Sequence, residues 1–317
     1  MTKDIFVTGS SGVLGFEALR CLTDLGRWAV HGVARRPLPV ADASLRHSVV
    51  PSVFDAQWLD DDSVSSTIVH FAGLSDPRAR FDGYVDLSIR EITPHIEMME
   101  AILARGWRGH LVYISSGGAI YGDVEELPIS ETHAPRPKGY YALQKISVEN
   151  ALVFLANQYD FRLTILRVSN PYGSKVPKKG QGVIPILLEA ATTGKPFTVI
   201  GTGEEMRDYL HISDFCAALA EVCGNPPPGS INTLNIGSGV GTSLNALLAL
   251  IKGMTGREIN ASSSETRYDV KSNVLDISRA RRLLSWSPQV SLNDGIGMMV
   301  EDDLELEKVD TAKLGFG

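Results

Sequence analysis

The 317-residue sequence has little cysteine: Cys21, Cys216 and Cys223 are odd in number and form no Cys-x-x-Cys pair. Disulfides are therefore not expected, which agrees with a reducing cytoplasm. The sequence also lacks any apolar run near the roughly 20 residues that a membrane span needs. A predicted strand that begins at residue 5 leaves no room for a signal peptide. We expect a cytoplasmic protein with no membrane partner.

Positive charge is not in excess, since 30 Lys and Arg face 37 Asp and Glu and the net charge is -7. The chain therefore has no basic surface for nucleic acid, and anionic ligands need local pockets of Arg, Lys and backbone N–H groups. The seven histidines show no metal-ligand spacing. We expect no metal, and we interpret the histidines as scattered surface residues and residues that surround a site.

Apolar strands alternate with helices in the first half of the chain. The predicted strands cover residues 5–8, 29–33, 49–54, 67–71, 111–115 and 163–168. The predicted helices cover residues 12–25, 87–104 and 140–158. Continuous apolar strands between helices favour a buried parallel sheet. The predicted fold class is α/β, with a Rossmann-type doubly wound parallel sheet and a smaller C-terminal mixed α/β substrate domain.

The composition changes after Asn170, where proline, glycine and lysine cluster before a predicted helix at 184–193 and a strand at 197–200. Length also suggests two domains. Residues 1–169 are predicted to form the dinucleotide-binding domain. Residues 170–317 are predicted to form mainly the substrate domain, with a segment near 207–240, including a strand at 234–236, that returns to the first domain.

A glycine-rich turn follows the first predicted strand with the spacing Gly-x-x-Gly-x-x-Gly. The predicted phosphate loop consists of Gly9, Ser11, Gly12, Val13, Leu14 and Gly15. The first glycine permits the tight turn, the second lets backbone approach a pyrophosphate, and the third permits close packing of helix on strand. The helix N-terminus then presents its positive end to the phosphates. The alternative is a generic strand–turn–helix.

The end of the second predicted strand bears on the choice of cofactor. A carboxylate there binds the ribose 2′-hydroxyl of NAD, but this position falls near Ala34, and Arg35 and Arg36 follow it. Two guanidinium groups can bind a 2′-phosphate. Alternatively, the pair stacks on adenine or is simply solvated. We expect NAD or NADP, and the arginines favour NADP-compatible binding.

A tyrosine and a lysine lie one helical turn apart at Tyr141 and Lys145, close enough to interact. An ammonium group favours the phenolate form of a tyrosine, whose ordinary pKa of about 10 is too high for a base at neutral pH. The lysine can also donate to the nicotinamide ribose. Tyr140 is a poorer candidate because its partner at the same spacing is Gln144. The alternative is a pair of amphipathic residues at a core edge.

Ser115 and Ser116 end a predicted strand at the carboxyl edge, where doubly wound sheets bind ligands. Ser116 is a candidate donor to a substrate oxygen, and the alternative is a pair of ordinary turn serines. Taken together, these motifs describe hydride transfer with a tyrosine as the proton shuttle.

The chain resembles the extended short-chain dehydrogenases/reductases of the sugar-nucleotide epimerase/dehydratase family, in particular the UDP-glucose (UDP-galactose) 4-epimerases. The resemblance rests on residues 8–15, 70–74, 115–122, 141–145, 166–173, 182–185, 207–211 and 273–276. By position it assigns Phe71, Ala72, Gly73, Ser88, Ser115, Tyr141 and Lys145 to the cofactor. It assigns Ser75, Gly117, Asn170, Val183, Ile184, Arg207 and Arg267 to the substrate.

Within that resemblance, Asn170 and the Arg207 and Arg267 forks contact a diphosphate, while Val183 and Ile184 border the nucleobase. Arg207 can instead form a surface ion pair with a neighbouring carboxylate. The family's catalytic Ser or Thr falls at Gly117, so Ser116 is expected to replace it. Ser88 stands in place of a usual Asn, and Ser75 in place of a Lys found in some epimerases.

The resemblance implies three alternative functions. The first is an NAD(P)-dependent nucleotide-sugar 4-epimerase acting on a UDP-hexose through a 4-keto intermediate. The second is an NADPH-dependent 4-ketoreductase of a deoxysugar nucleotide, and the third is a dinucleotide-binding protein without catalysis. No Asp-Glu pair follows the serine strand, which disfavours dehydration. The family often dimerises through helices corresponding to 87–104 and 140–158, so a homodimer is expected.

Overall fold

The computed structural model describes residues 3–60, 63–73, 81–176, 182–264 and 271–301. A seven-stranded parallel sheet has the order β10-β6-β5-β4-β1-β2-β3. Its strands are β1 (Asp4–Thr8), β2 (Ala29–Ala34), β3 (His47–Val49), β4 (Thr67–His70), β5 (His110–Ser116), β6 (Arg162–Val168) and β10 (Ile231–Ile236). The helices that cover it are α1 (Val13–Asp24), α3 (Thr93–Ala104), α4 (Tyr140–Tyr159), α6 (Ile212–Gly224) and α8 (Ser278–Leu284). The predicted fold class is confirmed.

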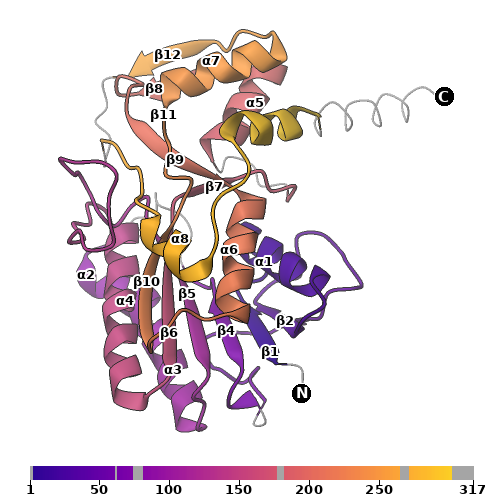
Figure 1. Ribbon diagram of the computed structural model, residues 1–317, viewed down its shortest axis with the longest axis vertical. Coiled ribbons are helices and arrows are strands. Elements are labelled where there is room, and N and C mark those ends of the chain that lie inside the picture. The colour runs from indigo at the N-terminus through magenta and orange to yellow at the C-terminus, as the bar shows by residue number, and fades with distance from the viewer. Residues whose placement is uncertain (1–2, 61–62, 74–80, 177–181, 265–270, 302–317) are drawn as a thin grey trace.

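Both faces of the sheet are buried, because successive side chains of a strand point in opposite directions. Val112 and Ile114 of β5 belong to a core shared with α1, α6 and α8. Leu111 and Tyr113, the alternate residues, belong to the core shared with α3 and α4. Figure 1 shows these helices on the two sides of the sheet. The carboxyl ends of the strands are left uncovered by these helices.

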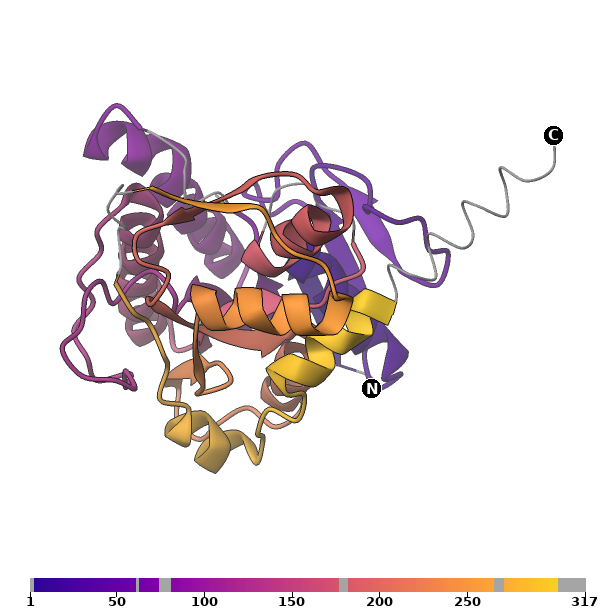
Figure 2. The same cartoon turned by 90° about the horizontal axis from the view of Figure 1, so that it is seen from above.

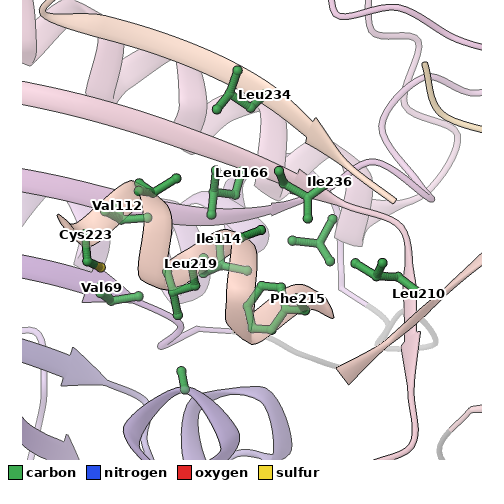
Figure 3. Close-up of a cluster of buried hydrophobic side chains, with 14 of the residues drawn as sticks. Val69, Val112, Ile114, Leu166, Leu210, Phe215, Leu219, Cys223, Leu234 and Ile236 are labelled. Atoms are coloured by element: carbon green, nitrogen blue, oxygen red, sulfur yellow. The ribbon is translucent and has the colours of Figure 1, made fainter. Parts of the chain in front are cut away.

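The late strand β10 pairs in parallel with β6 and forms one edge of the sheet. Its Leu234 joins the core beneath α6. In Figure 3, Phe215, Leu219 and Cys223 project from α6 toward Val112 and the neighbouring strands. Residues 231–236, although late in the sequence, are therefore part of the main sheet.

The second part of the chain lies beyond the carboxyl ends of the strands. It contains β7 (Asn170–Tyr172), α5 (Val183–Thr193), β8 (Phe197–Ile200), β9 (Met206–His211), β11 (Gly241–Ser243), α7 (Leu244–Thr255) and β12 (Ala261–Ser264). Its sheets have the orders β11-β9-β7 and β12-β8. A small core of its own, which includes Leu187, Tyr209 and Leu247, holds it together. Figure 2 looks from above onto this part, with α7 lying across it.

Two predicted elements differ from the structure. The strand predicted at 49–54 is wrong in position, since β3 is His47–Val49 and ends before Pro51, which has no N–H for a sheet hydrogen bond. The helix predicted at 87–104 is divided into α2 (Tyr84–Leu87), a π-helical segment (Ser88–Ile92) and α3. Pro94 lies in the first turn of α3, where its missing N–H costs no helical hydrogen bond, whereas in one continuous helix it would lie in the interior and break the regular pattern.

Several of the histidines are buried, so the interpretation of them as surface residues is wrong for these positions. His70, His95 and His110 are only 1 to 2% exposed. A core made of alternating sheet and helix layers accepts them because each ring hydrogen-bonds a neighbour. Within the described residues, no helix is both long and apolar enough to cross a membrane.

Candidate active site

The glycine-rich turn has the geometry of a phosphate cradle. Gly9 has φ +77°, and a Cβ there would lie 2.7 Å from the backbone N of Ala72. A Cβ on Gly15 would lie 2.3 Å from the Gly9 carbonyl oxygen. No side chain caps the start of α1 at Gly12, so the N–H groups of its first turn are available to an anion. These residues therefore fit a dinucleotide pyrophosphate.

The strands beside the turn hold the other predicted cofactor residues. The backbone N–H of Phe71 donates to the Thr8 carbonyl at 3.0 Å, which fixes the end of β4 against β1. Ala72 is buried, and Gly73 has φ +125°, where an added Cβ would lie 2.8 Å from His95 Nε2. The backbone of residues 71 and 72 thus lies close to the glycine-rich turn.

Other predicted cofactor residues lie in different surroundings. Arg35 and Arg36 are exposed directly after β2, at the edge where a ribose is expected. Ser88 lies in the π-helical segment, and its hydroxyl donates to the Tyr84 carbonyl at 2.8 Å. Ser11, Val13 and Leu14 are half-buried in and after the turn.

Tyr141 and Lys145 project from the first turns of α4. Burial raises the pKa of Tyr141, and a hydrogen bond with Ser116 opposes that rise. The Lys145 ammonium lies 5.9 Å from the centre of the Tyr141 ring and 5.1 Å from that of Tyr113. It donates to the Ile114 carbonyl at 3.0 Å. The structure thus brings the phenol, the serine and the ammonium group together at the end of β5.

The ionisation of Lys145 is finely balanced. Burial lowers its pKa to about 8, while the carboxylates of Glu149 and Glu91 act in the opposite direction. An ammonium group that remains charged at neutral pH stabilises a phenolate one helical turn away.

Gly117 has no room for the family's Ser or Thr side chain. A Cβ there would lie 2.6 Å from Leu275 Cδ1 and 2.8 Å from the Arg167 carbonyl oxygen. Leu275, which follows α7 by twenty residues, therefore occupies the space. Ser116, the preceding residue, is the hydroxyl that meets Tyr141.

A cavity of about 540 Å³ opens beside these residues, between the carboxyl ends of the strands and the second part of the chain. Six predicted residues line it: Ser116, Tyr141, Asn170, Val183, Ile184 and Arg207. Lys138, Glu205 and Tyr209 also line it. Its size suits a small-molecule ligand.

The substrate side of the cavity is held by backbone contacts. Asn170 Nδ2 donates to the Asp208 carbonyl at 2.9 Å. Arg207 Nη1 donates to the carbonyls of Met206 and Lys271, at 2.9 and 2.8 Å. These contacts hold an amide and a guanidinium group on one wall of the cavity. The predicted residues Ser75 and Arg267 lie outside the described residues.

Sequence reasoning missed a buried ion pair between helix α4 and strand β6. Glu149 and Arg167 are 2 and 7% exposed and lie 2.7 Å apart. The Ser115 hydroxyl, predicted to serve the cofactor, donates to Glu149 instead of facing the cavity. Two signals could have revealed the pair. Glu149 continues the four-residue spacing of Tyr141 and Lys145, and Arg167 interrupts an apolar strand.

Sequence reasoning also missed a chain of buried hydrogen bonds beside the cofactor strands. His70 Nδ1 lies 2.6 Å from Thr8 Oγ1, and His70 Nε2 lies 2.8 Å from His95 Nδ1. Gln144, next to Lys145, continues the chain at 3.2 Å from His95 Nε2. This chain of hydrogen bonds joins the end of β1 to helix α4.

Comparison with known proteins agrees with this geometry. The model of the NAD dependent epimerase/dehydratase family matches residues 5–237. UDP-glucose 4-epimerase of Mycolicibacterium smegmatis is 32% identical over 237 residues, which cover 74% of each chain. dTDP-4-dehydro-6-deoxyglucose reductase of Escherichia coli is 35% identical over 193 residues, and the match spans 60% of each chain. The structure of MoeE5 in complex with UDP-glucose and NAD superposes with a TM-score of 0.81 at 27% identity, covering 94% of this chain and 97% of that one.

Proposed function

Because the chain belongs to the NAD-dependent epimerase/dehydratase family, we propose that it is a nucleotide-sugar 4-epimerase acting on a UDP-hexose through a transient 4-keto intermediate. One observation carries the proposal. Tyr141 and Ser116 meet at the wall of a 540 Å³ cavity, with the Lys145 ammonium beside the phenol ring. This is the arrangement that removal of a proton from a sugar hydroxyl requires.

Each group has one task in this reaction. A bound nicotinamide cofactor would supply reversible hydride transfer at C4 of the sugar, which inversion at that carbon requires. Tyr141 takes the C4 hydroxyl proton and later gives it back. Lys145 stabilises the phenolate by its charge, and Ser116 donates a hydrogen bond to the C4 oxygen.

The phosphate loop and the cavity wall bind the two ends of the reactants. Gly9, Gly12 and Gly15 let the backbone approach the cofactor pyrophosphate. Asn170 and Arg207 hold the substrate diphosphate, assisted by Arg267 in the proposal. Val183 and Ile184, which line the cavity at the start of α5, border the uracil. The structural neighbour MoeE5 is in complex with UDP-glucose and NAD, which supports a UDP-sugar as the substrate.

Direct turnover tests the proposal. Purified protein should interconvert UDP-glucose and UDP-galactose without added cofactor, and mass spectrometry should find the dinucleotide that copurifies with it. Ser116→Ala should lower kcat on the order of 10- to 1000-fold if its hydroxyl serves the C4 oxygen. If neither sugar nucleotide is converted and no 4-epimer of a wider UDP-sugar panel forms, the epimerase assignment is wrong.

The second candidate is an NADPH-dependent 4-ketoreductase of a deoxysugar nucleotide. Arg35 and Arg36 favour it, because they are exposed at the edge where a 2′-phosphate would lie and a consumed cofactor is usually NADPH. The similarity to dTDP-4-dehydro-6-deoxyglucose reductase of Escherichia coli also supports this candidate. Stoichiometric oxidation of NADPH by a 4-keto-6-deoxysugar nucleotide would establish this activity, whereas an epimerase regenerates its cofactor in every turnover.

We also propose a homodimer formed through the helices before and including α4. Val85, Ile89 and Phe154 are apolar yet 71, 65 and 62% exposed. Large exposed apolar side chains on neighbouring helices are typical of an interface. Sedimentation equilibrium should give twice the 34.3 kDa chain mass, and a monomer at micromolar concentration would contradict the dimer.

A further inference from the structure

Helix α4 carries a third functional side chain in register with its catalytic pair. Tyr141, Lys145 and Glu149 follow one another at four-residue intervals and so lie along one stripe of the helix. Glu149 is only 2% exposed. A glutamate is almost never so deeply buried unless it is paired.

The Glu149 carboxylate is held by two neighbouring side chains. Arg167 of β6 donates to Oε2 from Nη2 at 2.7 Å and from Nε at 3.2 Å. The Ser115 hydroxyl of β5 donates to Oε1. A carboxylate with a forked guanidinium partner and a hydroxyl donor has one well-defined orientation.

The guanidinium group is itself anchored. Arg167 Nη1 donates to the Tyr121 hydroxyl at 3.0 Å, and that hydroxyl donates to Asn235 Oδ1 at 2.7 Å. Asn235 lies on β10 and Tyr121 follows β5. The network therefore ties α4 to the three strands β5, β6 and β10.

Glu149 reaches both halves of the catalytic group through this network. Its bond to Ser115 holds the residue directly before Ser116, which meets Tyr141. Its negative charge lies one turn from the Lys145 ammonium group. We propose that Glu149, held by Arg167, is a positioning residue that keeps Lys145 protonated and fixes the strand end that presents Ser116. The inference rests on the proposed function of Tyr141 and Lys145.

The charges around Lys145 support this role. Burial lowers the lysine pKa to about 8, and the Glu149 carboxylate opposes that effect more than Glu91 of the π-helical segment does. The other titratable groups that face Lys145 are Tyr141 on α4, Tyr113 on β5, His70 on β4 and His95 on α3. Burial raises the pKa of both tyrosines and lowers that of both histidines, so all four are neutral near pH 7.

The test is an NMR titration of Lys145, with ¹³C-labelled lysine in the full chain and assignment by Lys145→Arg. In Glu149→Gln, which keeps the side-chain shape and removes the charge, the lysine pKa should fall by about one unit or more. The alkaline limb of kcat/KM should move to lower pH by the same amount. An unchanged lysine titration overturns the proposal.

A matched control and a second variant separate electrostatics from damage to the fold. Glu17 is also 2% exposed and pairs with Arg20 at 2.6 Å, on α1, so Glu17→Gln should leave the Lys145 pKa in place. Glu149→Gln leaves Arg167 without a charged partner. Combining it with Arg167→Met removes both charges, and because losing the Arg167 cation acts on Lys145 in the opposite direction, the lysine pKa should fall less than in Glu149→Gln alone. A fall as large as in the single variant would show that the change comes from damage to the fold and would overturn the electrostatic role of Glu149.

The two proposals fail in different ways. If the wild-type protein turns over no nucleotide sugar, the proposed function is wrong, and the NMR titration still decides whether Glu149 controls Lys145. If the wild-type protein is active but Glu149→Gln changes neither the titration nor the alkaline limb, the proposed function stands and the inference about Glu149 is wrong.

Discussion

A methyl group at position 117 should damage both the fold and the reaction. The φ angle of Gly117 is not in the left-handed region, so the cost of Gly117→Ala comes from space alone. The new Cβ would lie 2.6 Å from Leu275 Cδ1 and 2.8 Å from the Arg167 carbonyl oxygen, about 1 Å closer than carbon atoms prefer. The side chain of Leu275 can rotate, but the carbonyl belongs to a central strand.

Two hydrogen bonds fix the backbone of Gly117, so it cannot shift to relieve the close contacts. The Gly117 N–H donates to the Val168 carbonyl at 2.8 Å, and its carbonyl accepts from Asn273 Nδ2 at 2.9 Å. Overpacking of this kind costs about 1–3 kcal/mol. Urea unfolding followed by circular dichroism should therefore show a folding equilibrium constant lowered by about 5- to 150-fold. Turnover should fall as well, because Ser116 is the adjacent residue.

The next residue supplies the control. A Cβ on Gly118 would lie 3.6 Å from Asn170 Oδ1, an ordinary contact, so Gly118→Ala should change stability by less than about 0.5 kcal/mol. Leu275→Ala opens a cavity of its own in the core, but in that background the added cost of Gly117→Ala should be smaller than in the wild type, since one of the two close contacts is gone. If Gly117→Ala is as stable and as active as the wild type, the crowding argument fails, and so does the assignment of Ser116 as the substitute hydroxyl.

Three further outcomes follow from the site and the core. Tyr141→Phe should lower kcat by about 10²- to 10⁴-fold while dinucleotide binding by fluorescence titration is retained; undiminished turnover would exclude this phenol as the proton acceptor. Arg35→Ala with Arg36→Ala should weaken NADPH binding far more than NADH binding, and equal weakening would dismiss the 2′-phosphate argument. Lowering the pH from 7 to 5 should cost about 2 kcal/mol for each of His70 and His110. Their folded pKa is about 3, against an ordinary 6.5, so the unfolded chain takes up protons first and stability present above pH 6.5 is lost as the pH falls. Equal urea midpoints at the two pH values would contradict this.

Local patterns in the sequence were sufficient for the main sheet. Six of its seven strands lie where apolar runs predict them, because a strand buried on both faces needs a continuous apolar segment. The position of the third strand was predicted wrongly because the strand is short and partly exposed at the sheet edge. Its residues therefore need not form a continuous apolar run. The division of the helix near Pro94 was also missed, because a helix-breaking proline is tolerated in a first turn.

Long-range contacts explain the rest of what sequence reasoning missed. The side chain that fills the space at Gly117 belongs to Leu275, and no local pattern connects residues so far apart. The partner of Glu149 likewise comes from a different element, β6. By contrast, Tyr141 and Lys145 share one helix, and their spacing alone predicts that they are neighbours. Local geometry is readable from spacing, whereas packing between distant segments is not.

The position of β10 at the sheet edge has a consequence for synthesis of the protein. The outer hydrogen-bonding edge of strand β6 is covered by Ile231–Ile236. While the ribosome is still translating the intervening segment, that edge is open and apolar, a template on which nascent chains can pair wrongly. A shortened protein that stops before residue 231 should therefore accumulate in inclusion bodies, even though it retains the whole glycine-rich turn and helix α4.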